Sequence, residues 1–466
     1  MDRARTECER SVLLLGRIWY VTLFFQLVES VVPLRVSVFK IAFVIISVLL
    51  VKLILIDYRA YLPQIVKNIG NIVKNIKFVI VFLGLYIIFD IVSFLYTEDI
   101  KYASVKYIVV IEMLIFAGIY LVYIVISGEA YSKCKDKLLL TIAASGVAVS
   151  SIAVVNYFME FFPLLYIRRL STLADYNQFA TIIVLGYLAG FLYLIEKSER
   201  NARNMALLSA LSVLELSTVY LSGSRRAFII EIFIVIFLVV FISINILRLK
   251  TERGKRAKNV CKFMVITIIG CVLLVGLMQY QFNRNYENGK HSMLENNVDE
   301  NFSTIFTGQA MGKRSIIWTI AFDELKTYNA KELLLGKGSS YSSDLYDSDV
   351  KEKLMNKYSQ QEKDSVVRHW MFAHNFLLSD MLTGGIIKLG FSLGLLFSII
   401  IYLFKLKVVE SKFWFLSIMI GVTYINAFLS FRYGFLGDKN YWFCLLLLLI
   451  SLENDIKSKE RNKYAV

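Results

Sequence analysis

The chain of 466 residues is too apolar for a soluble domain, because 57% of its residues are hydrophobic and its mean hydropathy is +0.59. A soluble fold of this composition would leave too little polar surface to cover its core. The formal net charge of +15 is scattered among short segments between apolar runs, which disfavours a nucleic-acid-binding surface. The sequence therefore predicts an all-α, polytopic membrane helical bundle.

Apolar runs long enough to cross a bilayer as a helix recur along the whole chain. The first has a basic start but no small-residue cleavage site, so it is expected to remain as an uncleaved anchor. Only three prolines occur, and none is expected at a helix centre, which disfavours the broken helices of secondary transporters. Twelve spans are expected, near 12–33, 36–57, 78–95, 107–127, 138–156, 179–195, 205–221, 227–247, 263–280, 384–404, 413–430 and 441–452.

Basic residues gather in alternate loops, which sets the expected orientation. The strongest block is the run 248–262 after the eighth span, and similar residues precede the first span and follow the last. Since positive segments resist translocation, these loops and both termini are expected in the cytoplasm. None of the five cysteines then forms an exported pair, so no disulfide is expected.

A long segment at 281–383 contains no apolar run of membrane-spanning length and is expected outside the cytoplasm. It divides the chain into nine spans at 1–280, this loop, and three spans with a tail at 384–466. Apolar residues recur at helical spacing from Ser315 to Leu325, which predicts an amphipathic helix on the membrane surface or capping the bundle. The sequence LLLGKGSS at 333–340 then predicts a turn.

Three groups of residues on this outer side could carry chemistry. They are Arg225 and Arg226 in a hydroxyl-flanked turn, Arg314 at the start of the amphipathic helix, and the pair His374-Asn375. Arginine stays charged and grips phosphate oxygens with a planar fork, which suits a pyrophosphate ligand. Histidine near neutral pH can contact phosphate or accept a proton.

Plainer interpretations of the same residues remain open. Arg225 and Arg226 could be interfacial anchors that reach toward headgroups, and Arg314 could simply solvate its helix. His374 could be a loop or capping histidine, the interpretation kept for His291 and His369. Carboxylates in apolar helices, which are costly and therefore face a cavity or a partner, occur at Asp90, Glu112, Glu215 and Glu231.

The order of these motifs resembles the O-antigen ligase and polymerase superfamily. That family has a hydroxyl-arginine motif between two helices, then a large outer loop with an Arg-x-x-x-Trp segment, a Gly-x-Gly turn and a His-Asn pair. An earlier outer loop at 168–180 is also similar, with Asp175-Tyr176-Asn177 where the family usually has Asn-Pro-Asn. The matching segments here are SGSRRA at 222–227, RSIIW at 314–318, GKG at 336–338 and AHNFLLSDMLTGGIIKLG at 373–390.

The resemblance implies a membrane glycosyltransferase with a C-type (GT-C-like) fold that uses a polyprenyl-pyrophosphate glycan as donor. It implies that Arg225 and Arg314 hold the pyrophosphate and that His374 is either a base or a phosphate ligand. No cofactor and no metal are expected, and direct displacement would invert the anomeric configuration. The residues expected to bind substrate are Arg226, Arg168, Arg169 and Asn375, with a role at the membrane surface as the alternative for Arg168 and Arg169.

Two classes of function remain after this comparison. The favoured class is an enzyme of the bacterial cytoplasmic membrane. A polysaccharide polymerase for capsule or O-antigen is the favoured enzyme, and the related ligase that passes a glycan to the lipid A core is the alternative. The other class is a flippase for lipid-linked units, which is disfavoured because the notable charges gather on one face beside a single large loop. Expected partners are the undecaprenyl-pyrophosphate-linked glycan, membrane lipids, a chain-length regulator and a flippase, with no nucleic acid.

Overall fold

The computed structural model describes most of the chain from residue 2 to residue 404, together with residues 446 and 447. All regular elements in these residues are helical. The described residues are 2–32, 34, 36–97, 100–127, 131–159, 161, 170–171, 176–197, 202–224, 227–234, 236, 253–288, 309–341, 345, 373–404 and 446–447.

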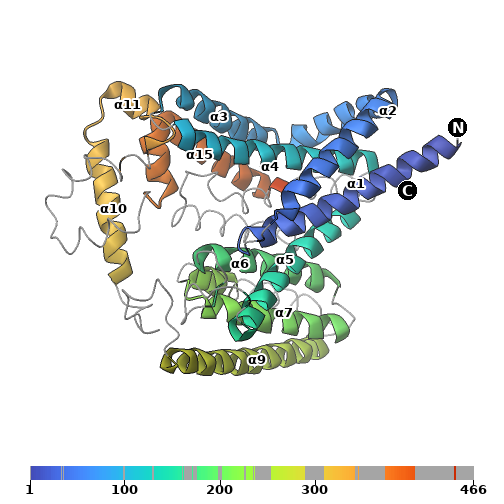
Figure 1. The fold of residues 1–466 in the computed structure, drawn as a ribbon, viewed down its shortest axis with the longest axis vertical. Helices are drawn as coiled ribbons and strands as arrows, with labels where there is room; N and C mark the ends of the chain where they lie inside the picture. Colours follow the sequence, from blue (N-terminus) through green and yellow to red (C-terminus); the bar gives the residue numbers. More distant parts are fainter. Residues whose placement is uncertain are drawn as a thin grey trace.

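Long helices make up the bundle, and shorter helices lie at one of its ends (Figure 1). Residues 227–234 form a further helical stretch after α7. The helices are α1 (Asp2–Glu29), α2 (Val38–Asn75), α3 (Lys77–Ser93) with a 3₁₀ turn at Phe94–Tyr96, α4 (Ile100–Ser127), α5 (Tyr131–Met159), α6 (Tyr176–Lys197), α7 (Ala202–Leu221), α9 (Arg253–Glu287), α10 (Gln309–Leu325), α11 (Ala330–Leu335) and α15 (Phe376–Phe404).

Seven of the described helices are long and apolar enough to cross a membrane. They coincide with the expected first, third to sixth, ninth and tenth spans, and Ala206–Leu221 is a shorter apolar helix at the seventh. The polytopic helical fold class is thereby confirmed. Apart from residues 446 and 447, the expected spans at 413–430 and 441–452 lie outside the described residues.

Two boundaries differ from the sequence-based expectation. The basic segment after the second span was expected to be a loop, but α2 continues through it to Asn75 and contains Pro63. Apolar residues recur every three or four positions from 65 to 73, and this periodicity sustains a helix beyond the membrane-length run. Around the long loop, α9 extends to Glu287 and α15 begins at Phe376, so the segment between these helices is shorter than 281–383.

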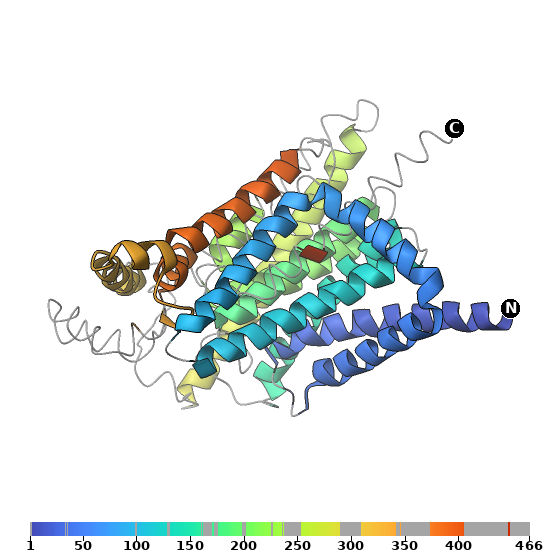
Figure 2. The same cartoon turned by 90° about the horizontal axis from the view of Figure 1, so that it is seen from above.

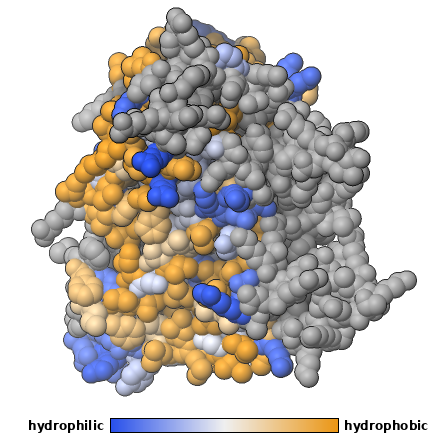
Figure 3. Space-filling view, turned by 90° about the vertical axis from the view of Figure 1, so that its right-hand side faces the viewer, coloured by the Kyte–Doolittle hydropathy of each residue, from blue (hydrophilic) through white to orange (hydrophobic). Residues whose placement is uncertain are grey.

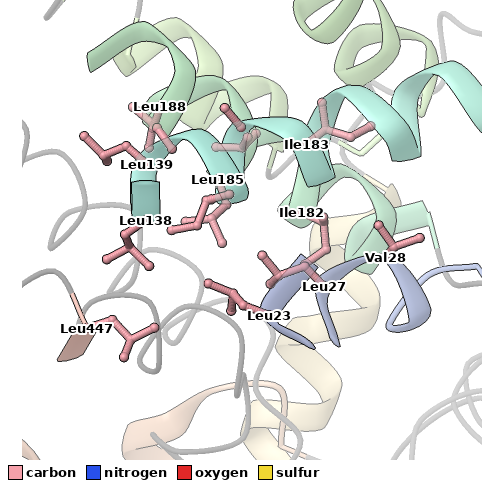
Figure 4. Packing of buried hydrophobic residues seen from close by; sticks show 14 of the residues in the cluster. Leu23, Leu27, Val28, Leu138, Leu139, Ile182, Ile183, Leu185, Leu188 and Leu447 are labelled. Atoms are coloured by element: carbon pink, nitrogen blue, oxygen red, sulfur yellow. The ribbon is translucent and has the colours of Figure 1, made fainter. Parts of the chain in front are cut away.

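The main core lies among α1, α4, α5 and α6. Leu23 and Leu27 of α1 lie on the side of that helix that faces Ile182 of α6, with Leu138 of α5 nearby (Figure 4). These side chains are almost fully buried, so they specify which helix faces meet. Elsewhere the helices expose apolar residues, and the described part of the face in Figure 3 is broadly apolar, as suits contact with lipid.

Glycines allow α5, α6 and α7 to approach closely. A Cβ atom built at Gly186 of α6 would lie 2.6 Å from the Cα of Gly146 on α5 and 2.9 Å from Oε1 of Glu215 on α7. Small residues at such crossings let membrane helices pack backbone to backbone. Glu215, one of the costly carboxylates noted in the sequence, therefore packs against glycine backbone at this crossing.

Helices α10 and α11 lie together beyond one end of α3 and α15 (Figures 1 and 2). A small second core joins α10 to the start of α15, and it includes Ile317, Ile320 and Leu382. This arrangement agrees with the interpretation of 315–325 as a helix that caps the bundle. We call residues 309–341 the cap.

The Gly186→Ala variant is expected to lower the free energy of unfolding by about 1–3 kcal/mol, because the new methyl group would overlap backbone that cannot move freely. Thermal unfolding of the purified protein in detergent would measure the loss. Gly118→Ala is the matched control, since a Cβ atom at Gly118 meets nothing within 4 Å. Equal effects of the two variants would contradict the proposed crossing.

Candidate functional site

The hydroxyl-rich turn after α7 is shaped by its own backbone. The N–H of Ser222 donates to the carbonyl of Thr218 at 2.9 Å, and the N–H of Gly223 donates to that of Tyr220 at 3.2 Å. Gly223 has a φ of 69°, a left-handed conformation that favours glycine at a helix end. The SGS sequence thus ends α7 and turns the chain sharply.

Ser224 begins the next helical stretch and also contacts α6. Its Oγ accepts a hydrogen bond from the N–H of Ala227 at 3.3 Å, as an N-cap residue does. The same hydroxyl donates to Oδ1 of Asn177 at 2.8 Å. A backbone bond of 2.9 Å from the N–H of Leu170 to the carbonyl of Leu221 adds a second link. Leu170 and Asn177, which are far from the SGS turn in sequence, therefore lie beside it.

None of the five predicted arginine ligands has a described side chain. Arg225 and Arg226 follow Ser224, and Arg168 and Arg169 precede Leu170, but these four lie outside the described residues. Arg314 lies on α10, one helical turn before Trp318, and its side chain is likewise not described. Their ligand roles stay predictions.

The tryptophan of the RSIIW segment joins α10 to the His-Asn segment. Its Nε1 donates to the carbonyl of Ala373 at 3.1 Å. Ala373 is fully buried and belongs to the second core together with Ile317. A hydrogen bond and an apolar contact surface thus hold the RSIIW helix against the residue that precedes His374.

His374 has a backbone conformation that is rare for its residue type. Its φ of 47° is in the left-handed region, and it is the one described residue other than glycine with a positive φ. Such conformations cost free energy and persist where the surrounding structure imposes them, often at functional sites. The side chain is partly exposed.

Asn375 caps α15. Its Oδ1 accepts a hydrogen bond from the N–H of Leu377 at 2.9 Å, and its carbonyl accepts one from Ser379 at 2.9 Å. Asparagine is among the preferred residues at this position, so the sequence contained a signal for a cap as well as for a ligand. The cap fixes where the helix starts and therefore where His374 leaves it.

The Gly-Lys-Gly turn binds a break in α15. At Gly385 the helix has a φ of 61° and a ψ of −160°, which interrupts its internal hydrogen bonds. The N–H of Lys337 donates to the carbonyl of Leu382 at 3.0 Å, and that of Gly338 donates to Thr383 at 3.1 Å. The turn thereby supplies donors to two carbonyls that an unbroken helix would satisfy itself.

Charged and aromatic groups hold the side chain of Lys337 in this turn. Nζ of Lys337 lies 2.6 Å from Oε1 of the buried Glu324, which also accepts a hydrogen bond from the Tyr341 hydroxyl at 2.5 Å. The ammonium lies 4.7 Å from the ring centre of Tyr328. Burial raises the pKa of the Tyr328 hydroxyl well above its usual value, so the hydroxyl keeps its proton and donates to the carbonyl of Leu382 at 3.1 Å.

Residues 207–389 match the family model described as O-antigen ligase. The match covers less than half of the chain. It includes the motifs at 222–227, 314–318 and 336–338 and the last motif up to residue 389, so the predicted resemblance to the O-antigen ligase and polymerase superfamily is confirmed. A search of curated proteins found no match.

The match indicates the general kind of protein. Residues 207–389 are similar to a family of membrane glycosyltransferase-like enzymes, and the long apolar helices indicate a membrane-integral protein. The match includes Trp318 and Ala373, and it includes Ser224 but not its partner Asn177. Sequence patterns predicted the motifs but missed these contacts, which join segments 47 and 55 residues apart.

The Gly336→Ala variant is expected to loosen the cap. A Cβ atom at Gly336 would lie 2.3 Å from the backbone nitrogen of Gly384, and the φ of 68° is unfavourable for alanine. We expect a loss of about 1–3 kcal/mol in stability. Hydrogen exchange should also become faster at the amides of Lys337 and Gly338. Gly390→Ala is the control, because its Cβ atom meets nothing within 4 Å; unchanged exchange in Gly336→Ala would contradict the assignment.

Proposed function

We propose that the protein is a polysaccharide polymerase of the bacterial cytoplasmic membrane, with both termini in the cytoplasm. It would transfer glycan from an undecaprenyl-pyrophosphate-linked donor to a lipid-linked repeat unit at the outer face. The observation that supports this most is the bond of 3.1 Å between Trp318 Nε1 and the carbonyl of Ala373. It brings the helix that carries Arg314 against the residue before His374, so a cation and a base come from adjoining elements.

In this proposal the arginines stabilise the leaving group. Arg225 and Arg314 bind the pyrophosphate oxygens, and Arg226, Arg168 and Arg169 extend the cationic surface toward donor and acceptor. A glycosyl bond to pyrophosphate is already activated, so charge stabilisation and alignment are the main requirements. Ser224 supports this arrangement, because its bonds to Asn177 and Ala227 hold the residue directly before Arg225.

The reaction is a single displacement at the anomeric carbon. The acceptor hydroxyl attacks that carbon as the bond to the pyrophosphate oxygen breaks, and the electron pair leaves with polyprenyl pyrophosphate. His374 accepts the proton of the acceptor hydroxyl, and Asn375 contacts substrate beside it while its Oδ1 caps α15. Attack opposite the leaving group inverts the configuration, and the arginines rather than a metal ion neutralise its charge.

A second candidate is the O-antigen ligase reaction, which the description of the matched family model favours. It would use the same donor and displacement but would pass the glycan to a lipid A core. Incubating the purified protein with both acceptors separates the two, because the polymerase extends only the lipid-linked repeat unit. A chain-length regulator and a flippase are the protein partners that the polymerase proposal implies.

Removing either of the two leading arginines is expected to abolish polymer formation. Arg225→Ala and Arg314→Ala should lower turnover by about two to three orders of magnitude, the range for loss of a group that stabilises developing charge. Arg→Lys should rescue poorly, since lysine keeps the charge but loses the fork. Gel analysis of polymer length at matched expression measures the effect, with the exposed Lys326→Ala as control. Full-length polymer in both alanine variants would refute the pyrophosphate-ligand roles.

The stereochemistry and the base can be tested together with a synthetic lipid-linked donor. NMR of the product should show inverted configuration, and activity should persist in excess EDTA. His374→Ala should slow turnover by about two to four orders of magnitude if the imidazole is the base. Retained configuration, or activity that EDTA abolishes and a divalent ion restores, would contradict the direct displacement.

A further inference from the structure

A buried lysine lies near the start of α15, within an apolar helix. The side chain of Lys388 is 1% exposed, and its Nζ lies 2.5 Å from Oδ1 of Asp90 on α3. The same Nζ donates to Oγ1 of Thr383 at 2.9 Å and lies 3.7 Å from Oδ1 of Asp380. We call Asp90, Asp380 and Lys388 the buried triad.

The lysine side chain bridges the break in α15. Lys388 follows the break at Gly385, whereas Thr383 and Asp380 precede it. A Cβ atom at Gly384 would lie 2.4 Å from both Cβ and Cδ of Lys388, so the aliphatic stem passes directly over this glycine. One side chain thus ties both halves of the broken helix to each other and to α3.

Neighbouring groups hold the Asp380 carboxylate and the backbone of Asp90 in place. The Tyr86 hydroxyl donates to Oδ1 of Asp380 at 2.8 Å, and the Lys388 ammonium lies 5.3 Å from the centre of the Tyr86 ring. The carbonyl of Asp90 accepts hydrogen bonds from the hydroxyls of Ser93 and Tyr107. Helices α3 and α4 therefore anchor one side of the triad.

Buried charges are an expensive way to join two membrane helices. An ion pair there commonly contributes less stability than apolar residues of similar volume, whereas losing one partner leaves a buried charge without compensation. The three charged groups are then better explained by a role in positioning a helix than by a contribution to stability. The geometry they define is that of the short helical half at 376–384, which carries Asp380 and Thr383.

That half of α15 also carries the proposed base. Asn375 caps it and His374 precedes the cap, while the Gly-Lys-Gly turn binds its last carbonyls. A rotation of residues 376–384 would move His374 and the Trp318 contact together. Among the described residues, the triad links this half to the membrane helix α3 through charged side chains: Lys388 lies beside Asp380 of this half and beside Asp90 of α3.

We propose that Asp90, Asp380 and Lys388 are positioning residues that hold the first half of α15 so that His374 faces the reacting acceptor hydroxyl. This inference rests on the proposed function for the role of His374. It assigns no contact with substrate to the triad. The charges act on the reaction through the orientation of residues 374–384.

The central experiment compares single variants with a triple variant that lacks all three charges. Asp90→Asn and Lys388→Met each remove one partner and are expected to lower the melting temperature in detergent. The triple variant Asp90→Asn/Asp380→Asn/Lys388→Met removes all three charges and should recover a melting temperature within about 3 °C of the wild type. Its kcat is nevertheless expected to fall at least tenfold, with KM for the lipid-linked donor changed less than about twofold.

Hydrogen exchange gives a readout that does not depend on activity. Peptides that cover residues 376–384 should exchange faster in the triple variant, whereas peptides from α5 and α6 should not change. Thr383→Val is a milder variant, because it removes one bond to Lys388 and leaves no charge unpaired; it should lower kcat about threefold or more. The exposed pair on the cap gives the control Asp323→Ala/Lys326→Ala, expected to match the wild type.

The outcomes distinguish the positioning role of the triad from the proposed role of His374 as the base. Faster exchange at 376–384 with reduced kcat supports the triad as a positioning element. Wild-type kcat in the triple variant at wild-type stability, or unchanged exchange at 376–384 in both the triple variant and Thr383→Val, would overturn it. Full activity of His374→Ala would instead refute the role of the base, while the exchange measurement would still show whether the triad holds this half of the helix.

Discussion

The break in α15 is the feature on which the arrangement of the cap and the His-Asn segment depends. A helix interrupted at Gly385 leaves carbonyls near residue 383 without their usual donors, and in an apolar environment such groups must be satisfied by other parts of the protein. The Gly-Lys-Gly turn satisfies two of them and the Tyr328 hydroxyl adds a bond to one. The cap is therefore fastened at the break by backbone hydrogen bonds as well as by the second core.

Two contact regions follow from how helix ends meet. In one, the turn after α7 packs beside the start of α6 through Ser224 and Asn177. In the other, α10 packs beside the start of α15 through Trp318 and Ala373. The first region rests on the tight crossing of α5, α6 and α7, where Gly146 and Gly186 leave no room for larger side chains. Close packing of the membrane helices thus determines which polar ends can meet.

The residues that match the O-antigen ligase model, 207–389, include the turn after α7, the contact of α10 with α15, and the break in α15. An enzyme that transfers glycan from a lipid-linked donor has to bind a charged leaving group at the edge of the membrane and align an acceptor beside it. In the proposed function, Arg225 and Arg226, which follow the SGS turn in the sequence, and His374 meet those two requirements. The positive φ of His374 is consistent with a side chain whose direction matters more than its local conformational cost.

Apolar run length and motif order, both local properties, were enough to predict the helical membrane fold, seven of the spans and the superfamily. Periodicity also indicated the helix of the cap. The predicted end of α2 was wrong, because apolar residues continue at helical spacing beyond the membrane-length run. Only the tertiary structure showed which side chains pair with each other. Asp90 was expected to face a cavity or a partner, and that partner, Lys388, is 298 residues away. Spacing along a chain carries no information about such pairs, because they form only when packing brings separate helices together.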